Sequence, residues 1–286
     1  MKKVILILLS LCVLVACEQD FDELNDTHQR YITFVFNTNK LFADILRYDG
    51  SAFDIAKVEE LPSDRRVRIV TYCYNMEDSL IYKDVQLAKF NHYNSVKISH
   101  LDRNQAYNFV CVADVVRYSS VDYYSGVWNQ MHTTMWNDFY LYSDQRSDNP
   151  TDNVLGSVSV QLCPENQTYQ INFNPHTYNG YCVLEKLEGI SAIDGYIAYT
   201  VSFKLEDFEQ LYLGFLGCEF DYLNPRETIV LPLTLSHADN AFDVKLTTTN
   251  LNKVNTSIIN VENGSHRPFV AIFDCSNLEL KECIYY

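Results

Sequence analysis

The sequence has few of the patterns that enzymes use to hold substrates or cofactors. Nine glycines in 286 residues leave little room for the glycine-rich loops that cradle phosphate groups. No Gly-x-Ser-x-Gly segment is present to expose a serine nucleophile. Acidic residues are plentiful, but their spacing singles out no pair of carboxylates that would serve a glycosidase. We therefore expect a protein that is not an enzyme and that carries no cofactor.

Metal-binding patterns are missing too. The sequence has no Cys-x-x-Cys, and none of its seven histidines belongs to a His-x-x-x-His or Glu-x-x-His pair, which are spacings typical of zinc sites. Asp144, Asp148 and Asp152 could offer oxygen ligands to calcium, but they lack the EF-hand spacing and its bidentate glutamate. A solvated linker is the favoured interpretation of that segment, and no metal site is predicted.

Positive charge is scarce. There are 22 Lys and Arg against 37 Asp and Glu, a formal net charge of −15 at pH 7. Without residues 1–16, which contain Lys2 and Lys3 and no acid, 20 basic residues face 37 acidic ones and the charge is −17. Proteins bind nucleic acids largely through Lys and Arg, so no nucleic-acid partner is expected. The one basic cluster, Arg65-Arg66-Val67-Arg68, is expected to open a strand.

No apolar run is long enough to cross a membrane. Val4–Val15 is apolar except at Ser10 and follows a short basic head, which is the layout of a secretory signal peptide. A spanning helix needs about 20 apolar residues, and the segment that follows, Glu18–Glu23, is acidic and polar. The sequence therefore predicts that the hydrophobic segment is removed by processing.

The end of the hydrophobic segment carries the most specific motif. Leu14-Val15-Ala16-Cys17 looks like the lipobox of bacterial lipoproteins, in which small Ala16 precedes the cut and Cys17 becomes the acylated N-terminus. The alternative is an ordinary signal peptide in which Cys17 is incidental. Two or three chains such as palmitate, at about 0.8 kcal/mol per buried CH₂, anchor a protein stably. We predict a signal peptide at residues 1–16 and an outer-membrane lipoprotein held by lipid on Cys17.

The acidic residues after Cys17 have two interpretations. They resemble the surface-export signal of lipoproteins in the Bacteroidales, which favours display on the outer face of the outer membrane. They also suit a flexible, solvated tether over residues 17–29, which is the usual role of acidic runs. Both interpretations can hold together, and the predicted location is the cell surface.

Beyond the tether the sequence predicts strands. Short segments rich in Val, Ile, Tyr, Phe and Thr alternate with turn-forming residues. Asn179-Gly180 is a strong hairpin signal, and helical periodicity is confined to Leu205–Phe215 and one turn at Phe42–Arg47. The expected strands are Arg30–Phe36, Val67–Tyr74, Ser95–Ile98, Ala106–Val116, Val154–Leu162, Tyr169–Phe173, Gly195–Phe203, Thr228–Leu235, Ala241–Thr248, Arg267–Phe273 and Leu278–Tyr285.

This pattern favours two sandwich domains. Ser143–Asn153 is an unbroken run of polar residues and proline, which indicates a linker or exposed loop and divides the chain into residues 30–145 and 146–286. Leu101-x5-Tyr107 resembles the corner of immunoglobulin-like sandwiches, where a tyrosine early in a strand bonds back to the preceding loop. The predicted fold class is mostly β, with two immunoglobulin-like or transthyretin-like β-sandwich domains after the signal peptide.

The cysteines do not form a disulfide framework. Seven remain once Cys12 is removed with the signal peptide and Cys17 is acylated, and an odd number cannot pair fully within one chain. Cys275 and Cys283 flank an apparent hairpin and are the one disulfide predicted. Most of the others lie among apolar residues and are expected to be small buried side chains.

Two segments hold candidate sites. Trp128 and Trp136 lie near Tyr123 and Tyr124, with Asn, Gln and Asp close by, a combination that suits stacking on sugar rings and bonding their hydroxyls. The alternative is that both tryptophans are core residues, the more common fate of large aromatics. Asp78-Ser79-Leu80 matches the tripeptide on which Bacteroidales attach O-glycans, so its serine is a candidate glycosylation site.

The layout of lipobox, acidic tether and two sandwiches resembles the fimbrial anchor and assembly lipoproteins of the Bacteroidales. The resemblance is architectural over residues 17–286, and its motifs are confined to residues 1–23. It implies a non-enzymatic surface protein that anchors a fimbria-like assembly or serves adhesion, with other β-sandwich subunits as partners at its sheet edges. The alternative is a glycan-binding lipoprotein of a polysaccharide uptake system, with Trp128 and Trp136 in its site.

Overall fold

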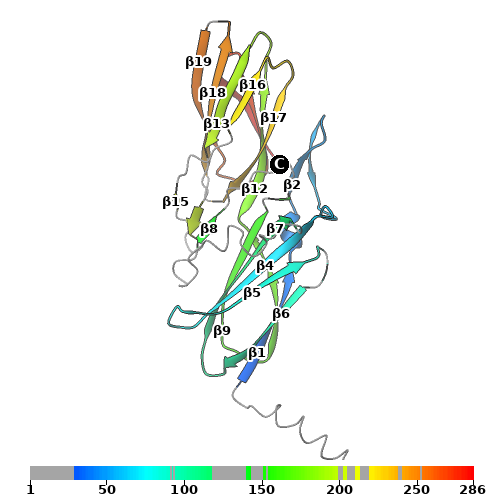
Figure 1. The fold of residues 1–286 in the computed structure, drawn as a ribbon, viewed down its shortest axis with the longest axis vertical. Coiled ribbons are helices and arrows are strands. Elements are labelled where there is room, and N and C mark those ends of the chain that lie inside the picture. Colours follow the sequence, from blue (N-terminus) through cyan, green and yellow to red (C-terminus); the bar gives the residue numbers. More distant parts are fainter. Residues whose placement is uncertain are drawn as a thin grey trace, which may run out of the picture.

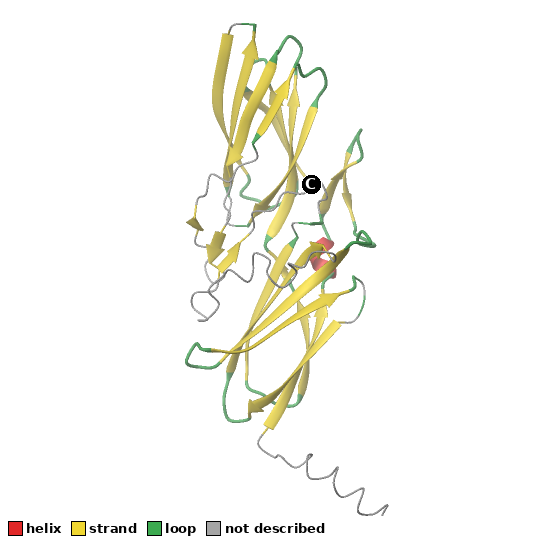
Figure 2. Ribbon diagram, viewed as in Figure 1, coloured by secondary structure: helices red, strands yellow, loops and turns green. Residues whose placement is uncertain are grey.

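Almost all of the regular structure among the described residues is β-strand. The computed structural model describes residues 29–90, 92, 94–117, 140–142, 151–152, 154–198, 202–204, 210–212, 219–237, 240–251 and 253–286. Within these ranges the strands form several sheets, and the helical structure is a short 3₁₀ helix, η2 (Asn39–Phe42) (Figure 2). The prediction of a mostly β fold is confirmed. No helix in the same ranges is long enough and apolar enough to cross a membrane.

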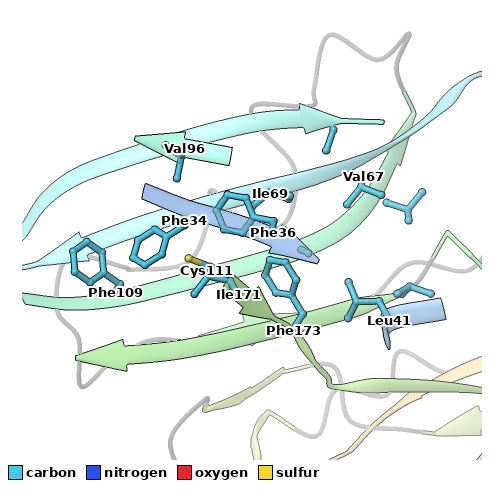
Figure 3. Packing of buried hydrophobic residues seen from close by; sticks show 14 of the residues in the cluster. Phe34, Phe36, Leu41, Val67, Ile69, Val96, Phe109, Cys111, Ile171 and Phe173 are labelled. Carbon is cyan, nitrogen blue, oxygen red and sulfur yellow. The ribbon is translucent and has the colours of Figure 1, made fainter. Parts of the chain in front are cut away.

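Two sheets enclose the first hydrophobic core, and we call them the first sheet pair. Their strand orders are β10 (Gln167–Asn172), β1 (Gln29–Asn37), β6 (Asn94–Asp102), and β11 (Asn174–Pro175), β9 (Leu155–Leu162), β7 (Tyr107–Arg117), β4 (Arg65–Tyr74), β5 (Leu80–Ala88). Phe34 of β1 and Phe109 of β7 meet edge to face between the sheets, with ring centroids 5.1 Å apart. Figure 3 shows this core filled from both sheets.

β4 is buried on both faces, and its two faces divide as period-two alternation predicts. Val67 and Ile69 pack in the first core, whereas Val70 and Tyr72 belong to a separate buried cluster on the other face. The basic cluster opens this strand, as predicted, because β4 begins at Arg65.

The predicted tyrosine corner is confirmed. Tyr107 is the first residue of β7, and its Oη accepts a hydrogen bond of 3.0 Å from the backbone N–H of Asp102, the last residue of β6. Leu101 beside it is buried in the first core. The bond fixes the angle at which the chain leaves one sheet and enters the other.

Two further sheets enclose a second core, and we call them the second sheet pair. Their strand orders are β17 (Ile229–Ser236), β12 (Thr177–Glu185), β20 (Phe269–Asp274), β21 (Glu279–Tyr285), and β16 (Phe220–Leu223), β13 (Ala192–Ala198), β18 (Ala241–Asn250), β19 (Lys253–Glu262). Two small sheets join β2 (Ile45–Tyr48) with β3 (Phe53–Ala56), and β15 (Gln210–Tyr212) with β14 (Ser202–Lys204) and β8 (Tyr140–Tyr142). The sheet pairs lie end to end, with β1 at one end and the β18–β19 hairpin at the other (Figure 1).

Strand pairing places the division between the sheet pairs later than the sequence suggests. β9 pairs with β7, and β10 pairs with β1, so residues 155–175 complete the first sheet pair although the expected boundary at 145/146 assigned them to the second domain. The chain enters the second sheet pair at β12. The polar segment was misleading because composition reports exposure, whereas sheet membership depends on partners distant in sequence.

The two helix predictions are wrong where the structure describes them. Residues 42–47 form the end of η2 and the start of β2 rather than one helical turn, and residues 210–212 within the predicted helix form β15. Short apolar runs satisfy helix and strand periodicity equally. Both segments form strands here because β2 pairs with β3 and β15 pairs with β14, which satisfies their backbone groups.

Asn179-Gly180 is not a turn. Both residues lie inside β12, paired with β17 on one side, and Gly180 also pairs with Phe269 of β20 on the other. A Cβ on Gly180 would lie 2.3 Å from Phe269 Cε1, so the glycine is needed because an aromatic ring approaches the backbone closely. The hairpin prediction fails because the same dipeptide serves close packing here.

The β2–β3 hairpin joins the two sheet pairs. It covers the outer face of β12 and β20, where Leu46 packs against Tyr181, Val183 and Val270. The Asn179 side chain bonds to both backbone groups of Leu46 in β2, as a residue of a neighbouring strand would. Its Oδ1 accepts from Leu46 N–H at 3.0 Å, and its Nδ2 donates to Leu46 O at 2.6 Å. Asn179 is 7% exposed, so these bonds satisfy backbone groups that water does not reach.

We predict that Asn179→Ala destabilises the protein by about 1–3 kcal/mol, because the buried Leu46 N–H loses its partner and Leu46 O keeps only the longer bond of 3.4 Å from Tyr181 Oη. Denaturant unfolding at pH 7.5 measures the change. The control is Asn172→Ala, which removes an exposed side-chain bond to Asn37 and is expected to cost less than about 0.5 kcal/mol. Equal losses in the two variants would contradict the bridging role of Asn179.

Candidate functional site

Most residues predicted to carry function lie outside the described ranges. Cys17, the signal peptide and the tether up to residue 28 are among them, as are Trp128, Trp136, Tyr123 and Tyr124, so these remain predictions. Ser79 is described. It is exposed in the turn between β4 and β5, where its N–H donates to Asn75 Oδ1 at 2.9 Å.

The predicted disulfide between Cys275 and Cys283 is wrong, because both thiols are free. Cys283 lies opposite Ala271 in the β20–β21 pair, four residues before Cys275. Four residues span about 13 Å along a strand, whereas bonded cysteines have Cα atoms within about 7 Å. Cys73, Cys111 and Cys182 are buried as expected, and Cys163 is exposed.

Asp152 takes part in an ion pair. Its carboxylate accepts two hydrogen bonds, of 2.8 and 2.7 Å, from Arg65 Nε and Nη2, the two-pronged geometry that arginine forms with carboxylates. Asp144 and Asp148 lie outside the described ranges. Among the residues that the structure describes, no three or more His, Cys, Asp or Glu side chains come together to hold a metal ion.

β19 is the longest edge strand among the described residues, and its charged residues, Lys253 and Glu262, lie only at its two ends. Edge strands expose unpaired backbone N–H and C=O groups, and proteins usually guard them with charges, prolines, bulges or short length. Each other edge strand in the described ranges has such a guard: Lys83, Asp84 and a register shift in β5; Lys97 and a register shift in β6; Pro232 in β17; Glu279, Lys281 and Glu282 in β21; and six residues or fewer in the rest.

β19 itself is long, regular and uncharged in its middle. All ten of its residues pair with β18, from Lys253 opposite Asn250 to Glu262 opposite Ala241, without a register shift. The stretch from Val254 to Val261 contains no charged residue, glycine or proline. On the outer face Val254 is 62% exposed and Ile258 is 63% exposed. A strand of this kind is suited to pair with another strand.

The outer face around β19 is ordered by contacts between neighbouring strands. Thr256 Oγ1 donates to Thr247 Oγ1 at 3.3 Å, and Asn260 Nδ2 donates to Asp243 Oδ1 at 2.9 Å. Lys245 Nζ lies over the Tyr196 ring at 5.4 Å from its centroid. The polar groups of this face are therefore engaged with one another, and the apolar side chains of β19 stand out to solvent.

A second feature is a pocket of about 420 Å³ at the junction of the two sheet pairs. It lies near the C-terminus, which Figure 1 places beside β2 and β12. The rings of Tyr178, His237 and His266 form part of its wall, with His237 stacked on His266 at 5.3 Å between centroids. The second sheet pair thus contributes aromatic rings to the lining, and Leu41 of η2 and Ile45 of β2 also line the pocket.

The histidines beside the pocket are held neutral by burial. Desolvation lowers the pKa of His176 to about 3, with a smaller contribution from nearby His237, and lowers the pKa of His237 to about 4, with a smaller contribution from His266. His176 is 5% exposed, and its Nε2 lies 2.6 Å from Ser157 Oγ of the first sheet pair. A proton on either ring would place a positive charge in a junction that is poorly accessible to water.

Sequence reasoning missed both features. No strand was expected at residues 253–262, although Val254, Thr256 and Ile258 are alternating β-branched residues that favour a strand. Turn-like Asn residues within and beside the segment obscured that signal. Nothing in the sequence brings His176, His237 and His266 together, because their proximity depends on three separate strand ends.

We predict that acid weakens the protein through His176. Its pKa is lower in the folded state than the unfolded value near 6.5, so the unfolded chain binds more protons between these values and stability falls as the pH drops below 6.5. At pH 5 the loss is about 2 kcal/mol relative to pH 7.5 for one fully buried histidine. His176→Gln should remove about that much of the difference in denaturant unfolding. His100→Gln, at an exposed histidine, is the control. Equal pH dependence of the unfolding free energy in the wild type, His176→Gln and His100→Gln would contradict the role of His176.

No protein-family model matches the chain, and no curated protein matches its sequence. Solved structures do match over most of its length. A Bacteroides thetaiotaomicron protein proposed to bind polysaccharide is 12% identical with a TM-score of 0.49, over 86% of this chain and 91% of the other. A fimbrial assembly protein from Parabacteroides distasonis is 11% identical with a TM-score of 0.42, over 90% and 99%.

The tip fimbrial protein Mfa3 from Porphyromonas gingivalis, with a C-terminal truncation, also matches. It is 9% identical with a TM-score of 0.46, over 90% of this chain and 100% of the other. The architectural resemblance to Bacteroidales surface proteins that the sequence predicts is confirmed as structural similarity over most of the chain.

Proposed function

We propose that this chain is a non-enzymatic, lipid-anchored surface protein that takes part in a fimbria-like assembly through strand pairing at β19. The observation that carries the proposal is the edge of β19, ten residues in unbroken register with an uncharged middle and exposed Val254 and Ile258. Strand addition to such an edge supplies main-chain hydrogen bonds for affinity and side-chain contacts for specificity.

The arrangement of the ends supports this role. β1 begins at the end of the molecule opposite the β18–β19 hairpin (Figure 1). A lipid on Cys17, a short distance before β1, would hold the β1 end at the membrane and direct β19 away from it. The edge would then be accessible to other surface subunits.

Two sandwich domains suit this role because they provide length. We propose that each sheet pair is one domain and that the chain passes between them after Pro175, where β11 ends and β12 follows. The β2–β3 hairpin and the Asn179 bonds would keep the two domains in a fixed orientation. A stiff connection would hold β19 at a constant distance from β1.

We predict that Cys17 carries the anchor. Metabolic labelling with palmitate should mark the wild-type protein and should not mark Cys17→Ser, because the thiol is the acylation site. Loss of acyl chains at about 0.8 kcal/mol per buried CH₂ should move the protein from the membrane fraction to the soluble fraction. Cys163→Ser, which removes an exposed thiol, is the matched control and should keep label and membrane association. An unlabelled wild-type protein would overturn the anchor.

We predict that Ile258→Lys reduces surface filaments by about tenfold or more, since burying an unpaired ammonium beside a docked strand costs more than the roughly 1.4 kcal/mol that a factor of ten represents. Filaments on cells carrying each variant are counted by electron microscopy, and surface amounts of the protein are compared by antibody labelling. Ile81→Lys is the control, because Ile81 is exposed on the guarded strand β5. Unchanged filament counts in Ile258→Lys would refute the assembly role of β19.

A further inference from the structure

We propose that the partner of β19 is β19 of a second copy of this chain, paired antiparallel about a two-fold axis at Thr256. This inference rests on the proposed function, because it names the partner at the same edge. The two four-stranded sheets would join into one continuous sheet of order β16-β13-β18-β19 followed by the same strands of the second copy in reverse. The pairing needs no change of fold in either copy.

The first argument is the face that each residue of β19 occupies. Val254 and Ile258 are exposed, and Thr256 and Asn260 bond to outer-face residues of β18, so these four side chains share the outer face. Residues directly opposite in an antiparallel pair lie on the same face. A pairing that extends both sheets must therefore set outer residues opposite outer residues, since a slip of one residue would exchange the faces.

The second argument is the chemical match that a two-fold axis produces. With the axis at Thr256, Val254 of each copy lies opposite Ile258 of the other, and the two threonines face each other. Apolar and Thr–Thr cross-strand pairs are stabilising combinations. An axis at Ile258 would set Val254 opposite Glu262, and an axis at Ser257 would set Val254 opposite Asn260. The Thr256 axis is the register that covers both exposed apolar side chains with apolar partners.

The third argument is charge. The paired stretch from Val254 to Ile258 contains no charged side chain, so two copies of an acidic chain meet at a neutral strip. Beyond it, Ile259 of each copy lies opposite Lys253 of the other. The charges of the rest of the molecule are screened over about 8 Å at physiological salt. A different acidic subunit would also need an uncharged contact strip. The match of Val254 with Ile258 across a two-fold axis, however, arises only when β19 pairs with a second β19.

The edge is also free over the required length. β19 has β18 on one side and no second strand on the other among the described residues. At its end Tyr285 Oη donates to Glu262 O at 2.6 Å, which occupies one edge carbonyl and leaves the stretch from Lys253 to Ile259 open.

Disulfide cross-linking on intact cells tests the register. The full chain carries Cys163→Ser to remove the exposed thiol, and Thr256→Cys is added. Two thiols on the axis lie directly opposite, within the about 7 Å between Cα atoms that a disulfide needs. Mild oxidation should convert this variant to a dimer of twice the chain mass on non-reducing gels, about tenfold more than in the Cys163→Ser parent or in Val254→Cys alone, whose thiols would lie about 13 Å apart along the strands.

Two further variants complete the test. Val254→Cys and Ile258→Cys, expressed together with different tags, should cross-link to each other. Ile258→Lys added to Thr256→Cys should abolish the dimer. The proposal is overturned if Thr256→Cys stays monomeric while its thiol reacts with a maleimide reagent, or if the cross-linked product contains a different protein. The second result would still support assembly at β19, whereas unchanged filaments in Ile258→Lys would remove the assembly role itself, so the two failures are distinguishable.

Discussion

The pair of hydrogen bonds between the Asn179 amide and the Leu46 backbone is the interaction on which the arrangement of this molecule depends. The β2–β3 hairpin leaves the first sheet pair and lies on the outer face of β12 and β20. Within it, the Leu46 N–H bonds to Asn179 Oδ1, and Leu46 O accepts from Asn179 Nδ2 and, at 3.4 Å, from Tyr181 Oη. Because one amide side chain both accepts and donates, it fills the place of a strand residue where no strand is present. That contact, together with the 2.6 Å contact between Ser157 Oγ and His176 Nε2, links the two sheet pairs.

A fixed orientation has consequences for the surface. β1 and the β18–β19 hairpin are held at opposite ends (Figure 1), so the edge of β19 is presented at a constant position relative to the start of the described chain. Every other long edge in the described residues has a charge, a proline or a register shift to discourage pairing. The proposed strand addition at β19 therefore uses the long edge whose middle carries none of these features.

Charge and apolar surface act over different ranges in this protein. A formal net charge of −15 discourages indiscriminate association between acidic bodies. The uncharged stretch of β19 provides backbone groups and two exposed aliphatic side chains that become favourable only at contact. The acidic charge would keep molecules apart elsewhere on the surface, and the uncharged stretch of β19 would allow contact at that one strand. At the junction of the sheet pairs, burial lowers the pKa of His176, so protonation of this side chain reduces the stability of the folded chain.

The sequence by itself determined the features that depend on residues close together along the chain. Alternation identified about half of the described strands, and Leu101-x5-Tyr107 identified the corner at Asp102, because side-chain direction and a bond across five residues are local. Tertiary structure alone decided the rest. Gly180 makes room for Phe269, Asn179 holds Leu46, Cys283 lies opposite Ala271 rather than Cys275, and β19 is an edge, since each depends on which distant strands become neighbours. The alternation of residue types indicates on which face of a strand a side chain lies. Only the folded chain determines which residues that side chain contacts.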